Sequence, residues 1–252
     1  MVGGDASEHP FLGRIYNRFQ NSFPKENIFL VTPAPGGGNI KKRLPGLPEE
    51  NLLLEPYKRG SATCMYYTSL KILRKNPEAV ILASPADYEI MDEDLFASTI
   101  DLSMDFVAKN DVLMTLGIIP RSAKTNFGYI QVKEGRGAHF MDQPLTVKTF
   151  TEKPPVELAE VFLRTGEFFW NSGIFIWKAS TIKAEITRYI PEIADMFEGW
   201  ESAVGTPSEA AFVEKAYSEA PKVSLDYGVM ERTDKAWLYP SRFGWADQAD
   251  FC

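Results

Sequence analysis

Residues 149–155 read TFTEKPP and place an acid beside a base at the end of a β-like run, LTVKTF. Glu152 and Lys153 are followed at once by Pro154 and Pro155. Proline disfavours the helical region for the residue before it, so we expect Lys153 to be extended. A fixed anion next to a fixed cation suits a ligand that carries both hydroxyl groups and a phosphate. A solvated strand end is the alternative interpretation.

Two aspartates follow predicted strands in distant parts of the chain. Asp87 lies in PADYEI, directly after the apolar run AVILAS, and Asp247 lies in FGWADQADF. Mg²⁺ prefers carboxylate oxygens and often completes its shell with substrate phosphates. Asp87 and Asp247 are therefore our candidate metal ligands, with Mg²⁺ as the candidate cofactor. A turn or N-cap aspartate is the alternative interpretation for each.

Three further segments have a polar group or a glycine where a ligand could approach. The loop EPYKRGSAT puts Arg59 and Gly60 at a helix N-terminus, where we expect outward-pointing amides to attract an anion or a base. An ordinary capped loop is the alternative there. Gly128 in TNFGYIQ is predicted to lie in a strand and marks a close approach to the backbone. Asn171 in FFWNSGIFIW can donate to and accept from sugar hydroxyls.

The elements that must position these residues alternate between strand and helix in the first half of the chain. Apolar runs of strand length lie at 27–32, 51–55, 79–84 and 111–119, with helical patterns at 61–75 and 92–110. This order predicts an α/β fold with a mainly parallel sheet, whose ligands bind beyond the carboxyl ends of the strands.

From about residue 125 the pattern changes to shorter β runs and then to a helical hairpin broken near Pro191. No linker rich in glycine or serine marks a second domain, so we expect one domain over 1–252. The aromatic-rich helical segment 189–200 would support a homodimer.

Composition excludes several classes of function. The net charge of −7 and the absence of a basic run argue against nucleic acid as a partner. No apolar run approaches the roughly 20 residues of a membrane-spanning helix, and no signal pattern opens the chain. The two cysteines, Cys64 and Cys252, form no metal-ligand spacing and no disulfide framework, so a cytoplasmic protein fits best.

The order of the motifs is more specific than any one of them. The segments LPEENLLLEPYKRGSAT, NPEAVILASPADYEI, TNFGYIQV, FTEKP, FFWNSGIFIWKASTI, VSLDYGVMER and FGWADQADF follow one another along the chain. In this order they resemble the nucleotide-sugar pyrophosphorylases, and among them the mannose-1-phosphate guanylyltransferases. The resemblance implies a Rossmann-like, mixed and mainly parallel sheet of the glycosyltransferase-A type. It also implies the formation of GDP-mannose and pyrophosphate from GTP and mannose 1-phosphate.

The same resemblance implies a role for each matching position. Asp87 and Asp247 would hold Mg²⁺, and Lys153 with Asp87 would carry the catalytic roles. The nucleotide would lie against Glu55, Arg59, Gly60 and Ala62. The sugar phosphate would lie against Gly128, Glu152, Lys153 and Asn171. Residues 1–124 would form the nucleotide half and 125–252 the sugar-phosphate half, with no C-terminal extension domain.

The chain departs from the family pattern at its start and near its end. The family opens with a strand and a GGxGxRxxP loop, and here only Gly3 and Gly4 remain, with Ala6 and Glu8 where a glycine and an arginine belong. Tyr88 stands where the family usually has histidine. Gln248 and Ala249 replace the usual small residues after Asp247. An acidic Glu8 is electrostatically unfavourable beside a triphosphate.

These departures leave two further hypotheses open beside an active guanylyltransferase. The chain could be a noncatalytic homologue that binds a sugar phosphate or nucleotide sugar as a regulatory subunit. It could also be a piece of a longer, active enzyme. The identity of the sugar and of the base depends on pocket shape, which the sequence does not give.

Overall fold

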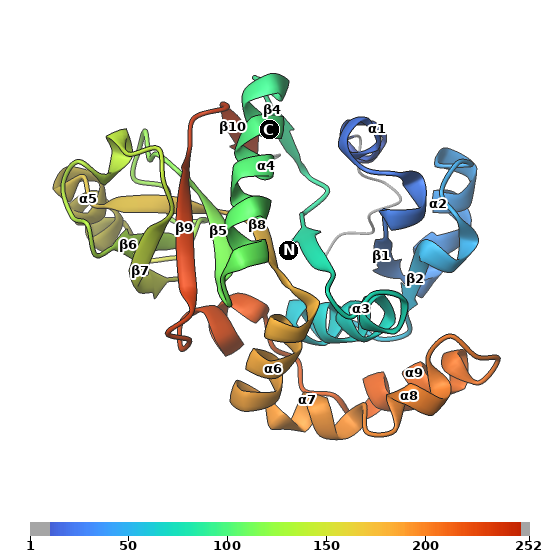
Figure 1. Cartoon of the computed structure of the whole chain (residues 1–252). Helices are drawn as coiled ribbons and strands as arrows, with labels where there is room; N and C mark the ends of the chain where they lie inside the picture. The colour runs from blue at the N-terminus through green and yellow to red at the C-terminus, as the bar shows by residue number, and fades with distance from the viewer. Residues whose placement is uncertain (1–10, 248–252) are drawn as a thin grey trace.

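The computed structural model describes residues 11–247, which form a mixed α/β fold (Figure 1). The largest sheet in this part of the chain has six strands in the order β3-β8-β5-β9-β7-β6. These strands are β3 (Val80–Ala83), β5 (Leu113–Ile118), β6 (Tyr129–Val132), β7 (Leu145–Thr151), β8 (Phe168–Lys178) and β9 (Ala236–Ser241).

The predicted α/β class is confirmed, and the strand pairings refine it. Strands β3, β5, β6 and β9 share one direction, and β7 and β8 run the other way. Within the described residues β5 and β9 are the sheet's only parallel neighbours, because β8 runs antiparallel between β3 and β5. Most neighbouring strands are therefore antiparallel, although most strands share one direction.

Two smaller sheets flank the large one. Strands β1 (Leu30–Pro33) and β2 (Leu52–Glu55) pair in parallel across helix α2 (Gly37–Arg43). Strands β4 (Tyr88–Ile90) and β10 (Trp245–Asp247) pair antiparallel. The sequence predicted one sheet for the runs 27–32, 51–55 and 79–84, whereas the described residues place β1 and β2 in a sheet separate from β3.

The remaining helical elements cover the sheets. They are α1 (Leu12–Ser22), α3 (Ser61–Lys75), α4 (Glu93–Lys109), α5 (Val156–Thr165), α6 (Ala179–Tyr189), α7 (Pro191–Met196), α8 (Trp200–Ala203) and α9 (Glu209–Glu219), with the π-helix η6 (Asp226–Met230). Short 3₁₀ turns are η2 (Lys25–Asn27), η3 (Ala34–Gly36), η4 (Glu49–Asn51) and η5 (Ala138–Phe140).

Alternating side chains of β8 divide the core between the two faces of the large sheet. Phe175 and Trp177 lie in a hydrophobic cluster with residues of α3 and α6. Ile174 and Ile176 lie in a second cluster with residues of α4. All six residues of β5 are buried, as expected for a continuous apolar run that is covered on both faces.

Local signals in the sequence predicted most element boundaries. Helix α3 spans the predicted range, and α4 begins after Asp92, whose side chain accepts a hydrogen bond from Leu95 N at 2.9 Å. Helix α5 ends before Gly166, which has a φ of +69°. Helix α7 begins at Pro191, where the break was predicted. Helices α1, α2 and α9 and strands β4 and β10 were not predicted.

The segment 189–200 packs into the core of the chain. Ile190, Ile193 and Phe197 are buried in the first hydrophobic cluster, and Tyr189 and Trp200 pack against it. The homodimer that this segment suggested stays a prediction.

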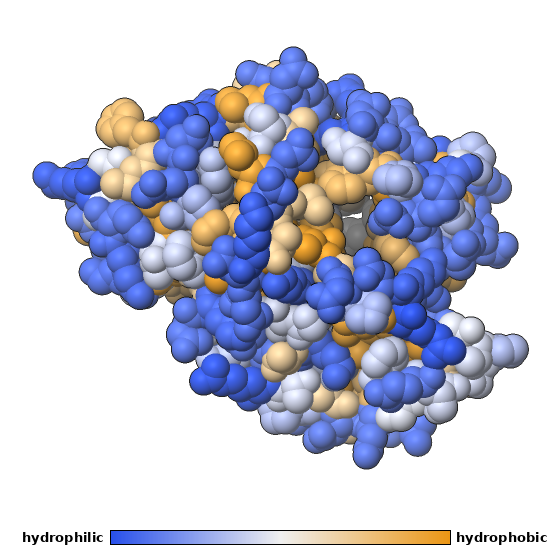
Figure 2. Space-filling model, in the orientation of Figure 1, coloured by the Kyte–Doolittle hydropathy of each residue, from blue (hydrophilic) through white to orange (hydrophobic). Residues whose placement is uncertain are grey.

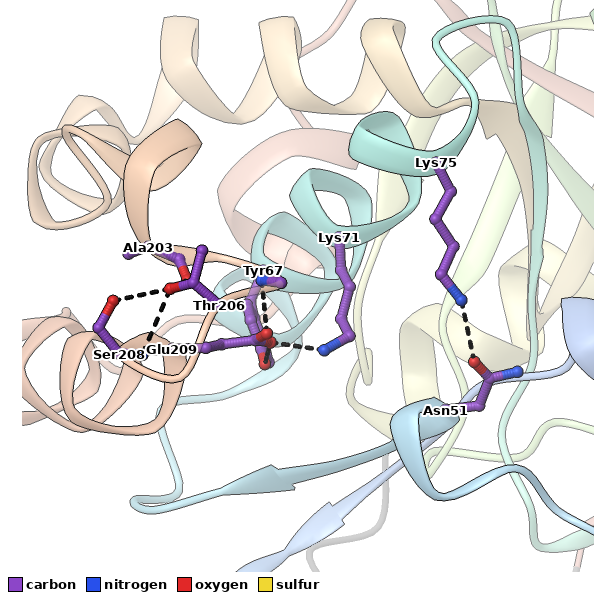
Figure 3. A network of polar contacts seen from close by, with 9 residues as sticks. Asn51, Tyr67, Lys71, Lys75, Ala203, Thr206, Ser208 and Glu209 are labelled. Atoms are coloured by element: carbon purple, nitrogen blue, oxygen red, sulfur yellow. Dashed lines mark hydrogen bonds and ion pairs between the residues drawn. The ribbon is translucent and has the colours of Figure 1, made fainter.

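Glu209, the first residue of α9, ties this helix to α3 (Figure 3). Its carboxylate lies 2.6 Å from Lys71 Nζ and accepts a hydrogen bond from the hydroxyl group of Tyr67. It also accepts from Gly205 N at 2.7 Å. Burial raises the pKa of this carboxyl, but the hydrogen bonds from Lys71, Tyr67 and Gly205 outweigh burial and lower it.

A second polar contact connects α3 to the segment before β1. Asn51 is fully buried, and its Nδ2 donates to the carbonyl oxygens of Glu26 at 2.8 Å and Ile28 at 3.0 Å. Its Oδ1 lies 3.4 Å from Lys75 Nζ (Figure 3). One buried amide thus fixes the entry of β1 against the start of β2.

The surface is mostly hydrophilic on the face shown in Figure 2. Apolar residues appear around a hollow between the part that carries β1 and β2 and the part that carries the large sheet. Over residues 11–247 no helix has both the length and the apolar character that crossing a membrane requires.

The pair formed by Lys71 and Glu209 generates a test of how α9 is held. Their side chains are only 14% and 15% exposed, so Glu209→Ala should lower the free energy of unfolding by about 3 kcal/mol by leaving the ammonium group uncompensated. Folding lowers the pKa of Glu209. The difference in free energy of unfolding between wild type and variant should therefore be largest above the ordinary carboxyl pKa and should decrease as the pH falls below it. Urea denaturation between pH 3 and pH 7 measures it.

The exposed pair of Lys41 and Glu49 is the matched control, with side chains 55% and 83% exposed. Glu49→Ala should leave the urea midpoint unchanged. Equal losses in the two variants would contradict the role given to Glu209.

Candidate active site

The candidate site is built around an interruption in the pairing of β5 with β8. Thr115 pairs with Phe175 and Gly117 pairs with Asn171, so four steps along β8 match two along β5. Side chains satisfy the backbone groups in the gap. Ser172 Oγ donates to Leu116 O at 2.7 Å and accepts from Ile174 N at 3.1 Å. The extra residues of β8 therefore form a fixed bulge directly after Asn171.

The side-chain amide of Asn171 is held on both ends. Its Oδ1 accepts from Gly173 N at 3.1 Å and lies 3.2 Å from Thr115 Oγ1. Its Nδ2 donates to Asp226 Oδ1 at 2.9 Å. The Gly173 amide must donate and the Asp226 carboxylate must accept, so these partners fix which end of the amide is oxygen.

Gly128 lies immediately before β6, not inside it as predicted, and its carbonyl oxygen accepts from Asn171 N at 2.8 Å. A Cβ at this position would lie 2.5 Å from Glu152 Oε2 and 3.3 Å from Asn171 Cβ. The predicted close approach to this backbone is therefore made by Glu152 and Asn171. Only glycine leaves room for the carboxylate where it lies.

Glu152 places one oxygen inside the structure. Its Oε2 is buried and has no hydrogen-bond partner among the described residues, whereas its Oε1 lies 3.6 Å from Lys153 Nζ. Burial, and next the charge of Asp226, raises the pKa of Glu152 above its ordinary value. A buried acceptor without a donor is suited to a hydroxyl group of a ligand.

The prediction that Lys153 is extended was wrong. Its φ is +47°, in the left-handed region, while its amide donates to Phe127 O at 3.2 Å. The chain leaves the β6–β7 ladder here to begin α5 at Val156, and this turn is made at Lys153 despite the proline that follows. The side chain is 64% exposed, so its ammonium is open to an anion.

The pairing of β4 with β10 brings the backbone of Asp247 beside the start of β4, which follows Asp87. Asp247 pairs with Tyr88, the neighbour of Asp87, and Asp87 is only 9% exposed. Tyr88 itself is buried, with a hydroxyl 2.8 Å from Ser84 Oγ. The described residues contain no group of three or more histidine, cysteine or acidic side chains suited to a metal. The metal role of the two aspartates therefore stays a prediction.

Two contacts connect this pair of aspartates to the residues around Asn171. A Cβ at Gly173 would lie 3.0 Å from Pro85 Cγ, two residues before Asp87. On the other side, the ring of Phe127 packs 5.2 Å from that of Trp245, two residues before Asp247. The two groups of predicted residues therefore belong to one continuous region.

The loop between β2 and α3 differs from expectation. The predicted outward-pointing amides are partly covered, because Ala62 N donates to Val223 O at 3.3 Å and Ser61 Oγ accepts from Leu225 N at 2.7 Å. Gly60 has a φ of +86°, and a Cβ there would lie 2.4 Å from Val223 O. Ala62 is fully buried. The segment 223–225 thus packs onto this helix N-terminus.

Arg59 also has partners within the chain. Its Nε donates to Tyr217 O at 2.7 Å and another guanidinium nitrogen donates to Ser218 O. These carbonyls lie at the C-terminal end of α9, where a cation is favoured. The nucleotide contacts predicted for Arg59, Gly60 and Ala62 stay predictions, and each residue has a packing role beside them.

Glu55, the last residue of β2, has a half-buried carboxyl group. Burial raises its pKa from 4.5 to about 7, against the opposing effects of the Tyr217 hydroxyl and Lys58. Its charge therefore changes near neutral pH.

Several predicted features lie outside the described residues, namely Gly3, Gly4, Ala6, Glu8, Gln248 and Ala249. Two residues of the site were missed, Asp226 and Thr115. The motif VSLDYGVMER contributed to the resemblance, but sequence reasoning gave Asp226 no role. Thr115 lies within an apolar run and gave no signal at all.

The half-buried carboxyl of Glu55 should make the free energy of unfolding depend on pH. Its pKa is raised in the folded state, so it favours folding most below its ordinary pKa of 4.5 and this contribution is lost as the pH rises through about 7. In Glu55→Gln the free energy of unfolding should not show this decrease with pH, which amounts to at most about 3 kcal/mol in the wild type. Urea denaturation of both proteins from pH 4 to pH 8 measures the difference. Glu50→Gln, at an exposed position nearby, should keep the wild-type profile, and parallel curves for wild type and Glu55→Gln would contradict the burial argument.

Comparison with known proteins identifies the family of the chain. A family model described as nucleotidyl transferase matches residues 32–247. A mannose-1-phosphate guanylyltransferase of Escherichia coli is 36% identical over 201 residues, which cover 79% of this chain and 42% of that protein. The xanthan biosynthesis protein XanB of Xanthomonas campestris is 32% identical over 203 residues, 80% of this chain and 42% of that protein. The chain thus spans about two fifths of the length of these relatives.

Solved structures share the fold. A crystal structure described as mannose-1-phosphate geranyltransferase from Thermus thermophilus has a TM-score of 0.81 at 25% identity and covers 94% of this chain and 65% of that chain. One described as mannose-6-phosphate isomerase from Helicobacter pylori has a TM-score of 0.75 at 20% identity, with 95% and 91% covered, and shows the fold alone. From the family match and these relatives, the chain belongs to the nucleotidyl transferase family.

Proposed function

We propose that this chain carries a nucleotidyl-transfer centre that makes GDP-mannose and pyrophosphate from GTP and mannose 1-phosphate. The observation that carries the proposal is the convergence of Gly128, Glu152 and Asn171, in a chain related to mannose-1-phosphate guanylyltransferases. Residues 1–124 serve the nucleotide in this proposal and residues 125–252 serve the sugar phosphate.

The sugar phosphate is bound at the end of β7. Glu152 Oε2, which has no donor among the described residues, accepts a hydrogen bond from a sugar hydroxyl. The exposed Lys153 ammonium, which lies 3.6 Å from Glu152 Oε1, holds the phosphate. Binding in this way aligns a phosphate oxygen for attack on the α-phosphorus of GTP.

The transfer is a single in-line displacement. A bond forms between the sugar phosphate oxygen and the α-phosphorus while the bond to the β-phosphate oxygen breaks, and pyrophosphate leaves with the bonding electrons. No covalent intermediate with the protein is required. The chain's contribution is to position the reactants and to balance the negative charge.

Asp87 and Asp247 fit a hard divalent cation, since the pairing of β4 with β10 brings two segments that carry carboxylates together and Asp87 is buried. They would hold Mg²⁺, which supplies neutralisation of the phosphate charges. Removal of the two carboxylates should therefore affect turnover more than folding.

The test of this function is pyrophosphate release by the purified 252-residue chain. Release should require GTP, mannose 1-phosphate and Mg²⁺ together, and Lys153→Met should raise the KM for mannose 1-phosphate by about 10- to 100-fold through loss of a charged hydrogen bond. Lys148→Met changes an exposed lysine on β7, the strand that precedes Lys153, and as the matched control it should retain wild-type kinetics. Binding of GDP-mannose without turnover would instead support a noncatalytic homologue, and absence of both would overturn the proposal.

Gly128→Ala tests the geometry of the sugar contact. The new Cβ would displace the Glu152 carboxylate from its place 2.5 Å away, so kcat/KM should fall about 100-fold while the melting temperature changes little. Gly13→Ala adds the same methyl group in α1, where no atom lies within 4 Å, and should be as active as wild type. A fully active Gly128→Ala would show that the position of Glu152 does not matter for the reaction.

A further inference from the structure

Asp226 occupies a position that neither the fold nor the metal pair requires. It is the first residue of the π-helix η6, and its Oδ1 accepts from Asn171 Nδ2 at 2.9 Å. Its side chain is half-buried, and Asn171 is the only hydrogen-bond partner of its carboxylate among the described residues. Single-turn π-helices are rare and frequently occur at functional sites.

The contacts of Asn171 show what this side chain can still offer a ligand. Its oxygen is already used by Gly173 N and Thr115 Oγ1. One of its two Nδ2 hydrogens is used by Asp226, which leaves one donor. A sugar hydroxyl both accepts and donates, so Asn171 alone satisfies half of its hydrogen-bonding capacity.

Asp226 supplies the missing half. A carboxylate has two oxygens, and Oδ2 is the one that does not contact Asn171. Asp226 is also close enough to Glu152 for its charge to raise the pKa of that carboxyl. Glu152 itself lies against Gly128, next to Asn171 Cβ. The three side chains thus form an acceptor, a donor and a second acceptor in one region, a pattern that matches neighbouring hydroxyls on a sugar ring.

We propose that Asp226 is a specificity-determining residue whose Oδ2 accepts a hydrogen bond from one hydroxyl of the sugar phosphate, beside the remaining Asn171 donor. This inference rests on the proposed function, because it names a further contact at the same sugar site. Asn171 then acts both as a contact and as the group that orients Asp226. A site built to satisfy a hydroxyl discriminates strongly against a sugar that lacks it.

The test compares mannose 1-phosphate with its 2-, 3-, 4- and 6-deoxy analogues by calorimetric titration. Asp226→Ala should weaken the binding of mannose 1-phosphate by about 10- to 100-fold, the effect expected for the loss of a charged hydrogen bond. For one deoxy analogue, wild type and Asp226→Ala should bind equally, since the hydroxyl that reaches Asp226 is then absent. If Asp226 had a purely structural role, its replacement would weaken the binding of every analogue by the same factor.

Two further variants separate contact from folding. Asp226→Asn keeps an oxygen toward Asn171 Nδ2, so its melting temperature should match wild type while the loss of selectivity among analogues remains. Asp234→Asn changes an exposed aspartate that is paired with Arg188 at 3.7 Å, and it should bind every analogue as wild type does.

The possible failures are distinguishable. If wild type binds mannose 1-phosphate and Asp226→Ala binds it equally well, the role of Asp226 is overturned and the proposed function stands. The same conclusion holds if Asp226→Ala binds every analogue more weakly by the same factor. If wild type binds neither mannose 1-phosphate nor GDP-mannose, the proposed function fails and this inference fails with it.

Discussion

The interrupted pairing of β5 with β8 is the constraint on which the site depends. The ladder is open between Asn171 and Phe175, where four steps along β8 match two along β5. Ser172 Oγ bonds to Leu116 O and Ile174 N in this gap, and Thr115 Oγ1 lies 3.2 Å from both Ile174 O and Asn171 Oδ1. Two hydroxyl groups inside an apolar sheet therefore stabilise a distortion that a sheet of purely apolar residues would not sustain.

The charges of the region explain why a cation belongs to the proposed reaction. Glu152, Asp226, Asp87 and Asp247 contribute carboxylates, and Lys153 is the cation nearest to Glu152 among the described residues. Both proposed substrates are polyanions, so a site of this composition repels them unless positive charge arrives with them. A divalent ion held by Asp87 and Asp247 would change that balance, whereas Glu152 and Asp226 are useful as acceptors for uncharged hydroxyls.

Periodicity and turn chemistry predicted much of the fold because these signals are local. The strands at 79–84 and 111–119, the helix at 61–75 and the break at Pro191 all follow from neighbouring residues. What depends on distant pairing was not predictable in this way. The antiparallel insertion of β8, the separation of β1 and β2, the turn at Lys153 and the covering of Ala62 by Val223 all come from contacts between segments far apart in sequence. Asp226 was missed for the same reason, since only Asn171, 55 residues away, reveals its role.

The segment 223–226 links the two proposed halves of the site. Val223 and Leu225 bond to the loop around Gly60 and Ser61, and the next residue, Asp226, bonds to Asn171. Because π-helix η6 follows at once and its Val229 and Met230 are buried, the segment that carries Asp226 is held on both sides, by the loop of residues 55–62 and by the core.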